Sequence, residues 1–85
     1  MKDTEKFVYR YLLKLAAPMK VSKYDTNCMA LAAQFVAAFP GYAPDFADLL
    51  NTRTRLRIVL VKLAERGIIR SHWTRGYGAV EFWVE

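Results

Sequence analysis

Three arginines, Arg53, Arg55 and Arg57, occupy alternate positions at the start of the stretch NTRTRLRIVLVKLAERG, residues 51–67. Each guanidinium carries five N–H donors in a planar fork, a shape that matches the oxygens of a phosphate or a carboxylate. Arginines at every second position would share one face of a β-strand but would spread around a helix. The secondary structure of this stretch therefore decides where the three cations point.

The apolar residues of this stretch favour a helix. They recur at i, i+3, i+4 and i+7 in Leu56, Val59, Leu60 and Leu63, whereas the alternation of a strand fails after Arg57. Asn51 or Thr52 is suited to cap the first turn, and Gly67 is suited to end the last. We therefore predict a helix over residues 52–66.

A shorter helix is predicted directly before this one, over residues 44–50. Pro44 suits a first helical position, and Asp45 would lie near the positive end of the helix dipole. A tight turn at Asn51 and Thr52 would separate the two helices. Three basic residues at the start of the second helix would face the positive end of its dipole, an unfavourable arrangement that an external anion would relieve.

The formal net charge of +5 is unevenly distributed along the chain. Residues 1–23 hold six bases and two acids, residues 24–52 hold three acids and no base, and residues 53–85 hold seven bases and three acids. This order predicts an anionic partner for the two outer regions and a spacer or protein-facing role for the middle one.

Few residues suit catalysis or metal binding. Cys28 is the only cysteine and His72 the only histidine, which excludes an internal disulfide and gives too few ligands for a zinc site. No catalytic set is supported by its spacing, and no glycine-rich phosphate loop precedes a helix. We expect no enzymatic activity, no metal and no cofactor. Cys28 is interpreted as a small core residue and His72 as a strand residue.

The length and composition predict one globular domain over residues 1–85, with 54% apolar and 25% charged side chains. No apolar run reaches the roughly 18 residues that a membrane span needs. The stretch MKDTEKFVYR also lacks the order of a signal peptide. We therefore expect a cytoplasmic protein that does not enter a membrane.

The first half of the chain predicts a helix over residues 3–17 and a brief strand over 19–23. Asp3 or Thr4 would cap the helix and Pro18 would stop it.

A second helix is predicted over residues 25–39, and it is apolar almost all around apart from Gln34. Such a helix is either central to the fold or buried against a second molecule. Because a small domain can cover only part of it, we predict a homodimer, or the docking of a protein partner, through Met29, Leu31, Phe35, Val36 and Phe39.

The end of the chain predicts a β-hairpin. IIRSHWT (68–74) and AVEFWVE (79–85) are rich in β-branched and aromatic residues, and the loop RGYG lies between them. One face of the last strand should be buried, since Val80, Phe82 and Val84 alternate with an outward face that carries Glu81, Trp83 and Glu85. Trp73 and Trp83 are interpreted as packing within the hairpin.

From Pro44 to Glu85 the chain resembles a winged helix-turn-helix domain, as in GntR- and MarR-type regulators and small phage, plasmid and archaeal DNA-binding proteins. The resemblance rests on the short helix DFADLL, the turn after it, the leucine-striped helix, the ending LAERGIIR and the hairpin RSHWTRGYGAVEFWV. It implies an α+β fold, mainly helical, with a C-terminal hairpin wing. Helix 25–39 departs from the family, which more often has one short strand between its first helix and the DNA-binding pair.

The resemblance also implies a function, namely a small transcriptional regulator that binds duplex DNA as a dimer. The second helix of the pair would enter the major groove, where arginine reads guanine and Ile58 would touch a thymine methyl. The implied contacts of this helix are Thr52, Arg53, Thr54, Arg55, Arg57, Ile58 and Lys62. The wing would bring Arg70, His72, Arg75 and Tyr77 to the DNA backbone or the minor groove.

Two alternatives stay open at this point. The domain could be a protein interaction module without a direct DNA role, which the apolar residues Ile58 and Val61 on the supposed reading face favour. The same basic surface could instead bind RNA.

Overall fold

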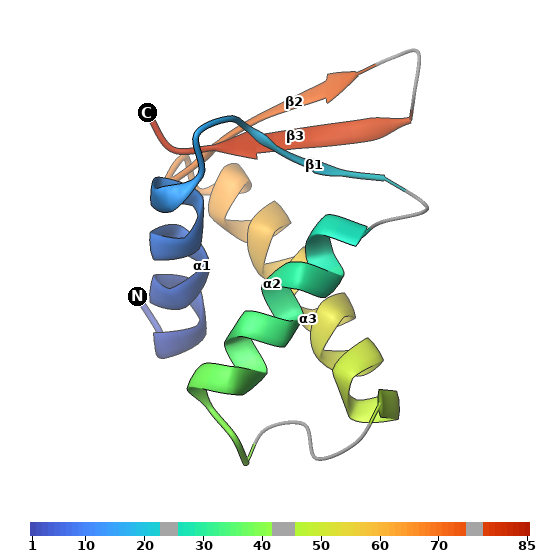
Figure 1. Cartoon of the computed structure of the whole chain (residues 1–85). Coiled ribbons are helices and arrows are strands. Elements are labelled where there is room, and N and C mark those ends of the chain that lie inside the picture. Colours follow the sequence, from blue (N-terminus) through green and yellow to red (C-terminus); the bar gives the residue numbers. More distant parts are fainter. Residues whose placement is uncertain (23–25, 42–45, 75–77) are drawn as a thin grey trace.

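The computed structural model describes residues 1–22, 26–41, 46–74 and 78–85 (Figure 1). Within these ranges the chain forms three helices and three strands, which are α1 (Asp3–Lys14), β1 (Met19–Val21), α2 (Thr26–Ala38), α3 (Phe46–Glu65), β2 (Arg70–Thr74) and β3 (Ala79–Trp83). The helices pack together on one side of the sheet that the strands form (Figure 1). The protein is thus a small α+β domain, and the predicted brief strand and C-terminal hairpin are confirmed.

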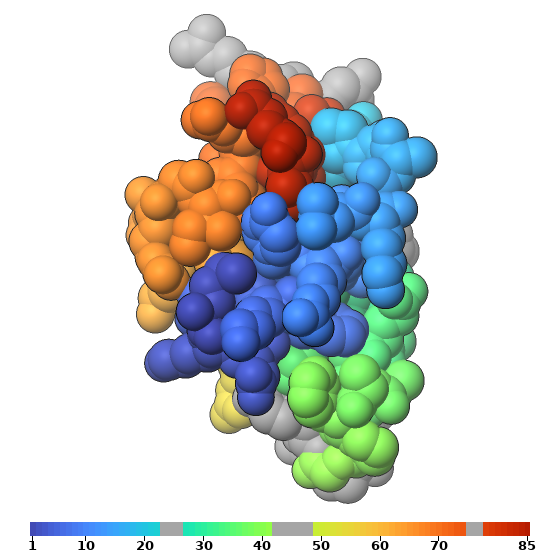
Figure 2. All heavy atoms as spheres, turned by 90° about the vertical axis from the view of Figure 1, so that its left-hand side faces the viewer, coloured from blue at the N-terminus to red at the C-terminus, as the bar shows by residue number. Residues whose placement is uncertain are grey.

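The first helix starts where the sequence predicts but is capped differently. Asp3 is already the first residue of α1, so neither Asp3 nor Thr4 is its cap. Instead the backbone N–H of Lys2 donates to Glu5 Oε1 at 3.2 Å, which is one half of a capping box. α1 ends at Lys14 rather than at residue 17. In the view of Figure 2, α1 faces the reader and lies between α2 and the end of α3.

The third helix runs without interruption from Phe46 to Glu65, so the predicted turn at Asn51 and Thr52 is wrong. No glycine or proline lies between these ends. The Thr54 hydroxyl donates to the Leu50 carbonyl oxygen at 3.2 Å, a bond that spans the predicted break. Residues with capping side chains start a helix only where the preceding backbone is not helical, and here it is helical.

This continuity changes the environment of the three arginines. Arg53 lies seven residues after the first residue of α3, Phe46. Because the dipole effect is confined to the first turn, it neither disfavours these cations nor calls for an anion to relieve them. What these arginines can bind is set instead by their exposure and their neighbours.

Gly67 ends α3 as predicted. Its φ of 73° lies in the left-handed region, which glycine adopts without a Cβ clash. The Gly67 N–H donates to the Ala64 carbonyl oxygen at 3.0 Å, and the Ile68 N–H donates to the Leu63 carbonyl oxygen at 3.0 Å. These two bonds form a Schellman motif, which turns the chain directly into the hairpin.

The sheet is antiparallel, with strand order β1-β3-β2. Met19 pairs with Phe82 and Val21 with Val80, and this face of the sheet packs against the helices. On β2, Ser71 and Trp73 pair with the same two β3 residues and so belong to that inner face. The other face of the sheet carries the alternate residues Lys20, Glu81, Trp83, Arg70 and His72.

One hydrophobic core joins α1, α2, α3 and the inner face of the sheet. Its fully buried side chains include Val8, Cys28, Leu31, Leu56, Leu60, Leu63 and Ile69. The predicted leucine stripe of α3 and the predicted core position of Cys28 are therefore confirmed.

Two of the five residues predicted for an interface on α2 are core residues instead. Leu31 is fully buried and Phe35 is 2% exposed, with its ring centroid 5.3 Å from that of Phe7. Met29 and Val36 are half-buried, and only Phe39 is exposed. One chain can cover the large side chains of this helix because most of its other positions are small, namely Ala30, Ala33, Ala37 and Ala38.

Candidate nucleic-acid interface

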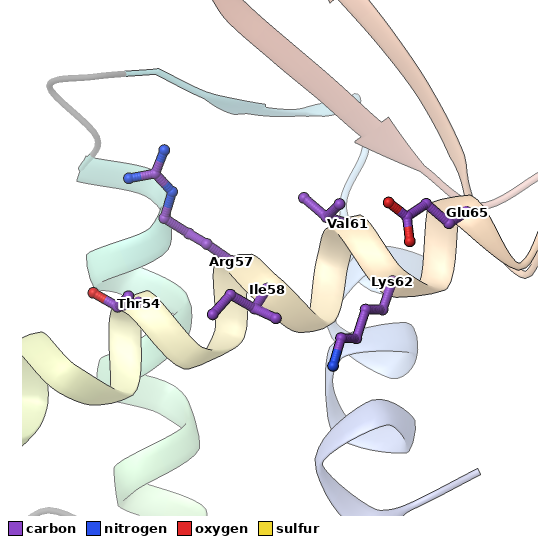
Figure 3. Close-up of a pocket in the computed structure, with 6 residues that line it drawn as sticks. All are labelled: Thr54, Arg57, Ile58, Val61, Lys62 and Glu65. Carbon is purple, nitrogen blue, oxygen red and sulfur yellow. The ribbon is translucent and has the colours of Figure 1, made fainter.

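The solvent side of α3 carries a shallow hollow. It is lined by Thr54, Arg57, Ile58, Val61, Lys62 and Glu65 (Figure 3). These residues recur at three- and four-residue steps, opposite the buried leucines, so helical periodicity alone brings them to one stripe. Together with Arg55 they make up the surface that we call the α3 face.

Two further hollows adjoin this one, one on each side of α3. Arg57 and Val61 also line a hollow formed with the inner face of the sheet. The sheet contributes Val21, Val80 and Phe82, and the adjoining residues Ser22 and Gly78 complete the lining. On the other side, Arg55, Ile58 and Lys62 help to line a hollow that reaches α1. Figure 3 shows Arg57 and Val61 rising from α3 on the side of the strands, while Lys62 points toward α1. The α3 face is therefore continuous with the sheet and with α1.

The charge of this face is mainly positive. Arg55 and Lys62 are exposed and Arg57 is half-buried, against one exposed acid, Glu65. None of these three basic residues forms an ion pair with another described residue. Their charge is therefore not neutralised by the acids that the structure describes.

Arg66, at the end of α3, differs because it is paired. Its Nη1 lies 2.5 Å from Glu5 Oε2, and this bond ties α3 to the start of α1. The Lys2 backbone N–H lowers the pKa of the Glu5 carboxyl, and the Arg66 guanidinium adds to this effect. Arg66 thus has a structural partner, unlike the basic residues of the α3 face.

The ion pair between Arg66 and Glu5 predicts that the stability of the fold depends on pH. Because the pKa of Glu5 is lowered in the folded protein, the Glu5 carboxylate should stabilise the fold above its ordinary pKa, and this contribution should fade as the pH falls through the folded value. The effect should be small because Arg66 is exposed. An NMR titration should show a lowered Glu5 pKa that Arg66→Ala raises only in part, since the Lys2 bond remains. If Arg66→Ala returned the Glu5 pKa fully to its ordinary value, the Lys2 N–H would not be the main cause of the lowered pKa.

Two predicted contact residues on α3 are not freely available. Thr52 is 3% exposed, so its side chain belongs to the interior, and its prediction as a DNA contact is revised. Thr52 lies four residues before Leu56 and shares the buried stripe of the helix. Arg53 is half-buried, and its Nε is buried without a hydrogen-bond partner among the described residues. Thr54, Arg55, Arg57, Ile58 and Lys62 do lie together on the α3 face.

The predicted basic residues of the wing do not join this face. Arg70 and His72 are exposed, but the strand register places them on the face of the sheet that points away from the helices. Arg70 Nε also lies 3.1 Å from Glu85 Oε2. Arg75 and Tyr77 lie outside the described residues. The spacing of basic residues along a hairpin does not reveal their face until the register with the next strand is known.

One residue that the sequence assigned to hairpin packing belongs to the inner face and is open to solvent. Trp73 is 58% exposed, although its cross-strand neighbour Val80 lines the hollow shared with Arg57. Alternation from the buried Ile69 through Ser71 to Trp73 is the sequence signal for this orientation. Which strands of the sheet the helices cover does not follow from the sequence.

Two absences concern the part of the chain that the structure describes. No group of three or more His, Cys, Asp or Glu side chains there could hold a metal ion. None of the helices found there has the length and apolar character needed to cross a bilayer. Compared with known proteins, the chain matches no family model, no curated protein and no solved structure.

Proposed function

We propose that this protein binds duplex DNA through the α3 face and the adjoining β2–β3 hairpin. The observation that carries the proposal is the continuous α3 face, on which Arg55, Arg57 and Lys62 have no described ion-pair partner. A polyanion such as DNA binds where basic side chains without ion-pair partners gather on one exposed helix face. Such side chains neutralise phosphates, and the counterions that the phosphates release favour binding.

The dimensions of α3 suit this partner. Its 20 residues extend over about 30 Å at the usual rise per residue. A helix of ordinary diameter fits the major groove of B-DNA, which is about 12 Å wide. Thr54 and Ile58, between the basic residues, are side chains suited to base edges and to thymine methyl groups.

The order of the elements agrees with the winged helix-turn-helix resemblance better than the sequence suggested. β1 stands between α1 and the α2–α3 pair, which is the position where this family more often has a strand. Helix α2 then corresponds to the first helix of the pair rather than to an addition. This order supports the proposal without being specific to the family.

Binding and its salt dependence test the proposal. We expect the protein to bind a blunt DNA duplex in a fluorescence anisotropy assay. The logarithm of its affinity should fall with the logarithm of salt concentration with a slope of about −3, one unit for each of the three basic residues of the α3 face. A duplex RNA of the same sequence should bind more weakly, since its major groove is too narrow for a helix. Absence of DNA binding at low salt would overturn the proposal.

Self-association is a further part of the proposal. A dimer would present two α3 helices to half-sites about 34 Å apart. We expect the protein to sediment as a dimer at micromolar concentration, and Phe39→Glu to yield a folded monomer if α2 carries the contact, because Phe39 is the large exposed apolar residue of this region. A strictly monomeric wild type that binds DNA tightly would contradict the dimer.

A second function is favoured by a specific observation. Ile58 is 51% exposed and Val61 is 47% exposed, and both lie in the middle of the α3 face. Exposed β-branched side chains at the centre of a surface suit a protein partner as well as a thymine methyl. A wild type that ignores DNA at low salt would make the interaction module the better function.

A further inference from the structure

Trp73 occupies an unusual place in the fold. It lies on the inner face of the sheet, on the same side as Phe82, which is 3% exposed, and Val21, which is 7% exposed. Trp73 itself is 58% exposed. Ser71, the other β2 residue on this face, is exposed as well, so the helices cover the face at Met19, Val21 and Phe82 but not along β2.

Packing in the hydrophobic core does not explain why an indole occupies this position. A tryptophan side chain is the largest apolar group available, and burial elsewhere on the same face shows that the protein can cover such groups when they lie above the helices. The core cluster does not include Trp73. Its replacement should therefore disturb folding little.

The cross-strand neighbour of Trp73 lines a hollow that also holds a cation. This neighbour, Val80, lines the hollow between the sheet and α3, to which Val61 and Arg57 contribute from the helix. Directly paired residues in an antiparallel sheet have Cβ atoms about 5 Å apart, so Trp73 starts from a backbone position next to this hollow, although its side chain does not line it. A hollow that holds a guanidinium, with an exposed indole on the neighbouring strand, suits a nucleotide, whose phosphate is anionic and whose base has an aromatic face.

An intact duplex cannot use this arrangement, because its bases are stacked on one another and offer only their edges. A base that is unpaired exposes its face, and tryptophan stacks on any such base. We propose that the hollow between α3 and the hairpin takes an unpaired nucleotide next to duplex DNA, with Trp73 stacking on the base and Arg57 contacting its phosphate. This inference rests on the proposed function and narrows its substrate to DNA that carries a local single-stranded defect.

Two DNA probes test the inference, namely a blunt duplex and the same duplex with one unpaired thymine. Wild type should bind the second probe about tenfold more tightly, the usual size of one base–aromatic stacking contact. Trp73→Ala should bind both probes with the same affinity, and Trp73→Phe should keep part of the preference. The matched control is Trp83→Phe, which changes the other tryptophan, on the opposite face of the sheet.

Fluorescence gives a second measurement on the same proteins. In Trp83→Phe, Trp73 is the one remaining tryptophan, and the unpaired thymine should quench its emission more than the blunt duplex does. If wild type binds both probes equally, or if Trp73→Ala keeps the preference, the inference is overturned while duplex binding stands. If wild type binds neither probe, the proposed function itself fails.

Discussion

Phe35→Glu is expected to prevent folding rather than to produce a soluble monomer. Phe35 is 2% exposed, and its ring centroid lies 5.3 Å from that of Phe7 and 4.8 Å from that of Phe39. A carboxylate at this site would be buried without a partner, at a cost of several kcal/mol. Small domains are stable by only about 5–15 kcal/mol in total, so this loss should remove most of the folded population.

Circular dichroism and thermal unfolding measure this effect. The matched control is Phe39→Glu, which places the same charge one helical turn later, at a residue that is 38% exposed. The control should keep the helical spectrum and a cooperative transition. A folded, monomeric Phe35→Glu protein would show that Phe35 is a surface contact between subunits, as the sequence alone predicted.

The second large effect concerns DNA. Replacing Arg55 and Arg57 together by alanine should weaken binding to a duplex about 100-fold, since a good arginine contact contributes about 1–3 kcal/mol. The salt slope should also become shallower by about two, one unit for each phosphate that the variant no longer neutralises. Arg53 is left unchanged in this experiment. Because it is half-buried, its replacement would change the stability of the fold as well as the affinity for DNA.

The control for this pair is the double variant Arg10→Ala with Lys14→Ala. It removes the same two charges from exposed positions of α1 that line none of the hollows around α3. Its affinity should change much less than that of the α3 variant. Equal reductions in the two variants would mean that only net charge matters, and the assignment of the α3 face would be wrong.

The elements of this fold were largely predictable from local sequence. Leu56, Leu60 and Leu63 repeat at helical spacing and are all buried, and Gly67 ends the helix with the left-handed backbone that favours glycine. The brief strand at Met19–Val21 and the C-terminal hairpin also follow from local pattern. The wrong prediction of a turn at Asn51 and Thr52 has a local cause as well, because residues with capping side chains inside a continuous helix resemble the start of a helix.

The composition of the candidate site was only partly predictable. Helical periodicity places Arg55, Arg57 and Ile58 on the solvent side of α3 once the buried stripe is known. It could not place Arg70 and His72, because the face of a strand residue depends on its register with a partner strand. It also could not show that Trp73 is exposed on the inner face of the sheet, since that depends on which strands the helices cover.

Local sequence was enough to locate most helices and strands, because hydrophobic period, glycine and proline act over a few neighbouring residues. The division of apolar side chains into core and surface depended instead on how the elements pack together. Leu31 and Phe35 are buried within one chain, whereas Ile58, Val61 and Trp73 are left in solvent. Burial is a property of packing between distant segments, and a side chain of the same type is covered or exposed according to what lies across from it.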